Sequence, residues 1–200
     1  MAEIKIMNRW DTKDIAVNDP GLRGYINLRP VIVPRSGGRT AKQQFHKSNM
    51  SIVERLMNRL FVPGHRGKKH LIASGQAGGK SATAFKIIKE TFNIIESRTK
   101  KNPVQVLVQA IENAALREEI TSFQMGGIMA RRAVITAPQR RVDLALRLIT
   151  QAAYQKALNN SKTMASALAD EIIAAHNHDS ATSVAIREKE RIEREAAGAR

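Results

Sequence analysis

A change of hydrophobic period near residue 48 most constrains the fold of this chain. From Ser48 onward, apolar residues recur every three or four positions in successive segments, the pattern of helices that each bury one face. One segment breaks the pattern: EEITSFQMGGIMARRAVITA has β-branched residues on both sides of Gly126-Gly127, which indicates a hairpin whose turn needs positive φ. The sequence therefore predicts a mainly α fold, a bundle of about six helices with a β-hairpin protruding between the third and fourth.

Start and stop signals delimit these helices. The third begins most clearly, because Asn102 can cap it and Pro103 occupies the first helical position, where a missing N–H costs nothing. Pro138 in the same way starts the fourth helix. A two-residue turn in the hairpin sets Met125 beside Ile128, giving an apolar tip. The other helices are expected from Ser48 or Ser51 to the stop at Pro63-Gly64, and at about 81–98, 161–176 and 180–197.

Residues 1–47 lack a helical period, and prolines punctuate them. GYINLRPVIVP is the only strand-like stretch there, so we expect an extended basic N-terminal arm, irregular with short strands. Its basic residues could lie along phosphates, or the arm could be a solvated tail; the sequence leaves both readings open. Residues 48–200 then form a helical RNA-binding domain, with the hairpin at 117–137.

Charge narrows the function. The 200 residues include 33 Lys and Arg against 18 Asp and Glu, a net charge of +15, which favours a nucleic acid partner. Aromatic residues make up only 4%, too few for base-stacking platforms, so structured RNA read through its shape and phosphates is expected, with DNA as the alternative. No cysteine is present, and no apolar run reaches membrane-spanning length, so we expect a cytoplasmic protein without a membrane partner.

The stretch SGQAGGKSATAF invites comparison with a nucleotide-binding P-loop. Gly79, Lys80 and Ser81 fit that pattern, but Ser74 stands where its first glycine belongs, and no apolar strand ending in Asp follows. A P-loop-like enzyme is thus the weaker alternative, and a loop meeting RNA phosphates through its backbone N–H groups is favoured. Histidine and carboxylate spacing indicates neither a metal site nor an acid/base pair. We therefore expect no enzyme activity, no cofactor and no small-molecule substrate.

Three motifs carry a family resemblance. NPVQVLVQAIEN, the Gly126-Gly127 hairpin and PQRRVDLALR strongly resemble the universal family of small-subunit ribosomal protein seven, and the long arm is similar to that of its archaeal-type branch. The resemblance covers residues 48–200 most clearly. The second hairpin strand reads MARRAVITA, where family members commonly have an aromatic residue and a proline.

The resemblance implies a structural constituent of the small ribosomal subunit. Such a protein binds the 3′ major domain of small-subunit rRNA, nucleates assembly of the head, and meets neighbouring head and platform proteins. The hairpin tip would lie near the exit-site tRNA and the mRNA exit path, and it comprises Met125, Gly126, Gly127, Ile128 and Met129. The candidate rRNA-binding residues are Arg35, Arg39, Lys42, Lys47, Lys68, Lys69, Lys80, Lys100, Lys101, Arg131, Arg132, Arg140, Arg141 and Arg147.

Overall fold

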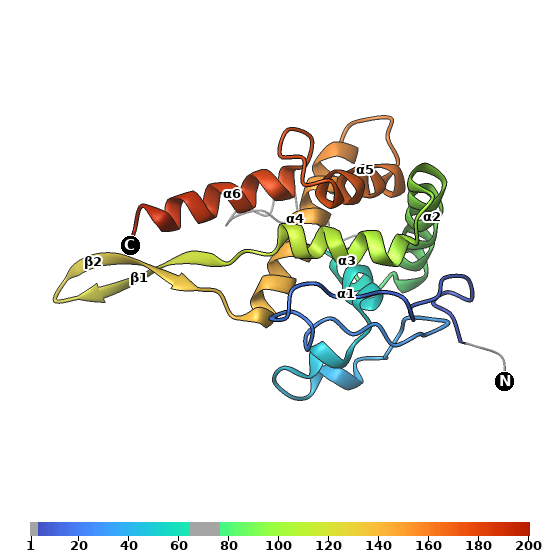
Figure 1. Cartoon of the computed structure of the whole chain (residues 1–200), viewed down its shortest axis with the longest axis horizontal. Coiled ribbons are helices and arrows are strands. Elements are labelled where there is room, and N and C mark those ends of the chain that lie inside the picture. Colours follow the sequence, from blue (N-terminus) through green and yellow to red (C-terminus); the bar gives the residue numbers. More distant parts are fainter. Residues whose placement is uncertain (1–3, 65–76) are drawn as a thin grey trace.

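The computed structural model describes residues 4–64 and 77–200. The helices and strands of these residues follow one another in the order η1 (Arg39–Ala41), η2 (His46–Asn49), α1 (Ile52–Arg59), α2 (Ser81–Thr99), α3 (Pro103–Ala114), β1 (Glu118–Met125), β2 (Ile128–Ile135), α4 (Pro138–Ala157), α5 (Met164–His176) and α6 (Val184–Ala197), where η marks a 3-10 helix (Figure 1). The predicted fold class is confirmed: a helical body carries one two-stranded antiparallel hairpin between α3 and α4. None of the helices in the described ranges has the length and apolar character needed to cross a bilayer.

Helix α3 packs against four other helices of the body, α2, α4, α5 and α6. Its apolar residues are buried over a wide face that includes Val104, Val106, Leu107, Val108 and Ile111. Its polar residues are spaced three or four apart and form a half-exposed stripe of Gln105, Gln109, Glu112 and Asn113. The helix is therefore amphipathic, and the other helices cover its wide apolar face.

Asn102 fixes the start of α3 and also ties the arm to it. Its Oδ1 accepts a hydrogen bond from the backbone N–H of Val104 at 3.1 Å, which confirms the predicted cap. Its Nδ2 donates to the backbone carbonyl of Asp11 at 2.7 Å. One side chain thus satisfies an orphan helix donor and anchors a distant segment.

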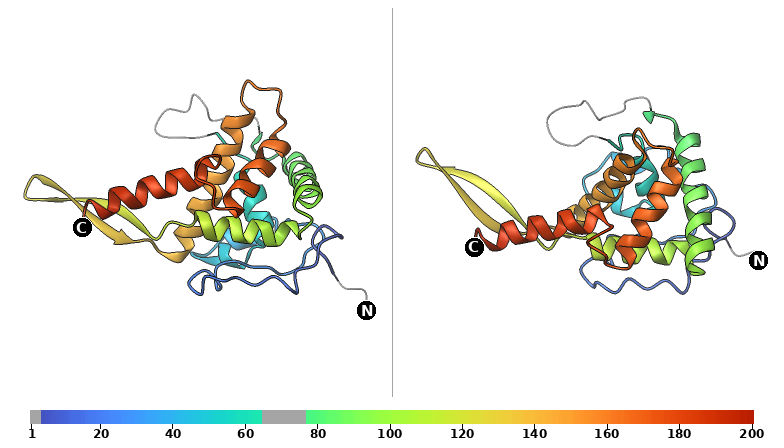
Figure 2. Two further views of the ribbon diagram at one scale, coloured as in Figure 1. Left: turned by 45° about the horizontal axis from the view of Figure 1, so that its top comes forward. Right: turned by 90° about the horizontal axis from the view of Figure 1, so that it is seen from above.

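The N-terminal segment lies along one side of the helical body (Figures 1 and 2). Trp10 is buried and its ring meets that of Phe92 edge to face, with centroids 5.3 Å apart. Leu22 and Ile26 are buried in the same core. Instead of the expected short strands, residues 4–51 have two isolated bridges, Ile6 to Trp10 and Asn27 to Ser51, and the two 3-10 helices. Contacts with the helices rather than a strand ladder hold this irregular backbone.

The hairpin extends away from the body, and α6 lies beside it in each view (Figures 1 and 2). Its register pairs Met125 with Ile128, as predicted, and the turn glycines have φ of 53° at Gly126 and 87° at Gly127. The hairpin is supported by α6, which contacts β1, and the backbone N–H of Ala133 donates to the carbonyl of Ala199 at 3.2 Å.

The double role of Asn102 is testable by substitution. Asn102→Ala removes the cap and the link to Asp11, and we expect it to lower the free energy of unfolding by about 1–2 kcal/mol. Asn102→Ser keeps a capping oxygen but cannot make the hydrogen bond to Asp11. It should therefore lower the free energy of unfolding by about half as much as Asn102→Ala. Urea denaturation followed by circular dichroism measures both. Equal stability of the alanine variant and the wild type would contradict the role.

Candidate nucleic-acid interface

A positively charged groove lies between α4 on one side and η2 and α1 on the other. Its volume is about 510 Å³. We call it the α1–α4 groove, and its lining residues are Phe45, Lys47, Met50, Arg55, Asn58, Arg59, Ala137, Gln139, Arg140, Asp143, Leu144, Leu146 and Arg147. Five of these side chains are cationic and one is a carboxylate. A concave surface with this balance concentrates a positive potential and attracts polyanions.

Asp143 organises one wall of the groove. Its two carboxylate oxygens accept hydrogen bonds from Lys47 and from Arg55, the latter at 2.9 Å. Arg55 is buried and also donates to the backbone carbonyl of Tyr25 at 2.8 Å. Burial raises the pKa of Asp143, but the hydrogen bonds from Lys47 and Arg55 outweigh burial and hold that pKa below its ordinary value. These two cations therefore join α1, α4 and the arm before any ligand is bound.

Arg59 and Arg147 form the other cationic part of the groove. Burial lowers the pKa of Arg59, and the nearby positive charge of Arg147 lowers it further. Within residues 4–64 and 77–200, neither guanidinium lies within ion-pair distance of a carboxylate. The Asp143 carboxylate attracts Arg59 and partly offsets the lowering of its pKa, but it is already paired with Lys47 and Arg55. A phosphate would therefore stabilise the two like charges of Arg59 and Arg147.

Arg140 and Arg141, both predicted to bind rRNA, hold the base of the hairpin in this structure. Arg140 pairs with Glu119 through two hydrogen bonds, at 2.6 and 2.7 Å. Arg141 donates to the Leu116 carbonyl at 3.0 Å and to Asp19 at 2.6 Å. Their charges are thus largely neutralised by groups of this chain, and both connect α4 to segments far away in the sequence.

The remaining predicted cations fall into separate groups. Arg131 and Arg132 are exposed on β2, where adjacent side chains point to opposite faces. The exposed arm residues Arg35, Arg39 and Lys42 lie in or next to η1, which packs against η2 and so extends the basic surface beyond the groove.

The helix α2 separates the last described candidates. Lys80 is exposed at its first turn, and Lys100 and Lys101 are exposed just after its far end, about 28 Å away for 19 residues. Lys68 and Lys69 lie outside the described residues. The hairpin is the only sheet in the described part of the chain, so the parallel sheet that a P-loop enzyme needs is not found there. Those residues also hold no cluster of three or more potential metal-ligating side chains.

The hairpin tip is apolar and exposed. Ile128 is 74% exposed and Met129 is 64% exposed, at the end of the structure farthest from the core. Phe123, on the first strand, is also exposed. Exposed apolar side chains on a protruding element are typical of a contact surface.

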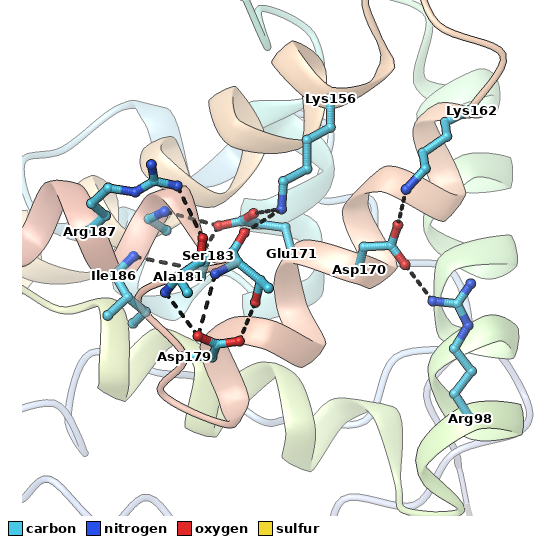
Figure 3. A network of polar contacts seen from close by, with 12 residues as sticks. Arg98, Lys156, Lys162, Asp170, Glu171, Asp179, Ala181, Ser183, Ile186 and Arg187 are labelled. Carbon is cyan, nitrogen blue, oxygen red and sulfur yellow. Dashed lines mark hydrogen bonds and ion pairs between the residues drawn. The ribbon is translucent and has the colours of Figure 1, made fainter.

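A buried carboxylate at the opposite end of α6 fixes how that helix leaves the body (Figure 3). Glu171 is fully buried, and it accepts hydrogen bonds from the Ser183 hydroxyl at 2.8 Å and the Ala185 N–H at 3.0 Å. Lys156 supplies the balancing charge from α4. Asp170, the residue before Glu171 in α5, forms a separate group with Arg98 and Lys162. The bonds to Glu171 lock the first turn of α6 against α4 and α5.

The far end of α6 then supports the hairpin. Glu193 accepts a hydrogen bond from the Arg117 backbone N–H at 2.8 Å, where the chain enters β1. Arg200 pairs with Glu118 at 2.6 Å. Together with the pair between Arg140 and Glu119, these contacts hold the hairpin base from two sides.

The residues of the groove that could not be predicted from the sequence include Phe45, Arg55, Arg59, Gln139 and Asp143. Part of the signal was present, because Arg55 and Arg59 are four apart on one helix, as are Asp143 and Arg147 on another, so each pair shares a face. Which two faces meet depends on tertiary packing, and no spacing in the sequence encodes it.

The organising role of Asp143 predicts a pH dependence. Its depressed pKa means that it stabilises the fold above the unfolded-state pKa of about 3.9 and loses this effect as pH falls through the folded-state value. Asp143→Asn leaves buried Arg55 without its anion and should cost about 2 kcal/mol at pH 7. The difference in free energy of unfolding between this variant and the wild type, measured in urea titrations, should narrow below about pH 4.

Asp170→Asn is the matched control. Asp170 also pairs with two cations, but these are about half exposed. Asp170→Asn should therefore lose less stability than Asp143→Asn. If the difference in free energy of unfolding between Asp143→Asn and the wild type stayed constant from pH 7 to pH 2, ionised Asp143 would not have the stabilising role assigned to it.

The sequence of this chain is similar to those of known proteins. Residues 22–200 match the family model described as ribosomal protein S7p/S5e. The small ribosomal subunit protein uS7 of Nanoarchaeum equitans is 49% identical over 198 residues, which is 99% of this chain and all of that protein. The proteins of the same name from Methanothrix thermoacetophila and from Methanococcus maripaludis strain C7 are 46% and 45% identical, over 98% and 99% of this chain and their whole lengths.

These similarities extend over nearly the whole chain, including the irregular arm, and the three relatives are archaeal. The predicted resemblance is therefore confirmed, as is the expectation that the protein is not an enzyme, since the family is one of structural ribosomal proteins. The chain belongs to the ribosomal protein S7p/S5e family, in its archaeal-type branch.

Proposed function

We propose that this chain is a structural constituent of the small ribosomal subunit that binds and organises the 3′ major domain of its rRNA and nucleates assembly of the head. The observation that carries the proposal is the α1–α4 groove, in which Arg59 and Arg147 lie together without a carboxylate partner among the described residues. The net charge of +15 supports the same partner.

The cations divide into two classes under this proposal. Lys47, Arg55, Arg140 and Arg141 are paired within the chain and build the shape of the surface. Arg59 and Arg147 contact phosphates in the groove, and exposed cations of the arm and of β2 continue the path on either side. Phosphate contacts of this kind position a protein on folded RNA without reading its bases.

The hairpin has a second role in this proposal. Its apolar tip, exposed at Ile128 and Met129, lies near the exit-site tRNA and the mRNA exit path, while the helical body is held on rRNA. The surfaces left over meet neighbouring head and platform proteins, in cytoplasmic ribosomes. The protrusion of the hairpin and its two-sided support favour this division, because a contact far from the body needs a fixed direction.

A general DNA- or RNA-binding protein is the alternative, and direct binding separates the two. A transcript of the 3′ major domain should bind tightly with an affinity that falls steeply with salt, since each neutralised phosphate releases counterions. Unrelated structured RNA and duplex DNA should bind more weakly. Equal affinity for all three would leave only a general binder, and ATP binding without a preference for RNA would support a nucleotide site at Lys80.

The groove predicts a specific effect on that titration. Arg147→Gln should weaken binding to the transcript and lower the slope of log K against log salt by about one, because one phosphate contact is lost. Arg191→Gln changes the charge equally on α6, where Arg191 is already paired with Glu188 and Glu195, and it should leave the slope unchanged. Identical salt slopes for the two variants would mean that Arg147 makes no phosphate contact and that the groove is not part of the RNA interface.

Substitutions at the hairpin tip should have the opposite effect: they should spare rRNA binding and disturb the handling of tRNA or mRNA. Replacing Ile128 and Met129 by Ser should leave both the thermal midpoint and the affinity for the transcript unchanged, because these side chains are exposed and far from the groove. Subunits assembled with this variant should instead bind exit-site tRNA more weakly or place mRNA less accurately, as measured by filter binding and toeprinting. A loss of rRNA affinity in this variant would contradict the proposed division of roles.

A further inference from the structure

Phe45 is an exposed aromatic side chain at the α1–α4 groove. It is 60% exposed and lines the groove with its five cations. The backbone at Phe45 is left-handed, with φ of 65°, immediately before η2. A bulky residue in this conformation is uncommon and costs free energy, which the rest of the fold must offset.

The fold itself gains little from this placement. The ring is mostly in solvent, whereas Trp10 and Phe92 are buried in the core. Glycine would fit the same backbone without strain, as Gly38 does at the start of η1 with φ of 80°. An aromatic residue at a strained, exposed position beside a cationic groove indicates a ligand with a flat face.

Gln139, which also lines the groove, has a polar atom without a partner in the described part of the chain. Gln139 is only 6% exposed and its Oε1 accepts a hydrogen bond from the Ser48 hydroxyl, but its Nε2 has no partner among the described residues. Exchanging the two amide atoms would leave the other one without a partner instead, so in either orientation one buried amide atom beside the groove is unsatisfied among the described residues.

We propose that the α1–α4 groove binds an unpaired nucleotide of RNA, with its base stacked on the ring of Phe45 and its flanking phosphates on Arg59 and Arg147. The inference rests on the proposed function and adds a mode of recognition to it. It also revises the expectation, drawn from the low aromatic content, that this protein reads only shape and phosphates. One well-placed ring suffices for one base, since every base has a π-face.

An RNA strand fits the groove better than an acidic protein segment does. The single carboxylate of the groove, Asp143, is already paired with Lys47 and Arg55, so the charge left over is positive. Carboxylates of a protein could neutralise Arg59 and Arg147, but they would leave the exposed ring without a flat partner. A nucleotide satisfies the cations and the ring together.

The experiment compares Phe45→Leu, Phe45→Trp and the wild type in binding to the 3′ major domain transcript, with no other protein present, over a range of salt. Leucine keeps an apolar side chain without a ring, and its affinity should fall on the order of tenfold with an unchanged salt slope. Tryptophan keeps a ring and should bind at least as well as the wild type. Its fluorescence should be quenched by the transcript beyond any change at Trp10, the only other tryptophan.

The outcomes separate the inference from the function on which it rests. If the wild type does not prefer this transcript, the proposed function fails. If the wild type prefers it but Phe45→Leu binds equally well, or Phe45→Trp binds as weakly as Phe45→Leu, then stacking fails and rRNA binding stands. An effect of Phe45→Leu that appears only with other ribosomal proteins present would overturn the proposal in favour of a protein contact. Thermal midpoints within a degree of the wild type exclude misfolding.

Discussion

Burial of the wide apolar face of α3 is the constraint on which the rest of the structure depends. Because α2, α4, α5 and α6 all pack against this helix, their places are set together, and its ends lead directly to the arm contact at Asn102 and to the hairpin. Each enclosing helix then has one face committed to the core and another free for charge. This arrangement lets a chain of net charge +15 keep a dry core while its cations collect on the outside.

The cations themselves do two kinds of work. Arg55 and Arg141 are partly or wholly buried and join segments 88 and 122 residues apart, through Asp143 and Asp19. Arginine suits this task because its planar fork can bond two acceptors while its charge is satisfied by one carboxylate. The consequence is that a count of basic residues overstates the surface available to RNA, and the unpaired cations identify that surface more closely.

Local chemistry explains what could be predicted from the sequence. The cap at Asn102, the proline starts of α3 and α4, and the register set by Gly126-Gly127 depend on neighbours a few residues away, so the sequence pattern encodes them. The arm and the groove depend on long-range packing. Prolines in the arm indicated extended chain, but burial of Trp10 against Phe92 was decided by a helix some eighty residues away. Likewise, Arg140 and Arg141 were recognised as important, but their carboxylate partners at the hairpin base were not.

The hairpin shows why such long-range pairs matter for function. Two isolated strands with an apolar tip are only marginally stable in water, and a free hairpin would sample many directions. Here Glu119 is held by α4 and the backbone at Arg117 is held by α6, whose own first turn is locked by buried Glu171. The base of the hairpin therefore cannot pivot without breaking contacts on two helices. A tip built from exposed Ile128 and Met129 can then meet its partner with little loss of orientational freedom, because folding of the body has already fixed the direction of the hairpin.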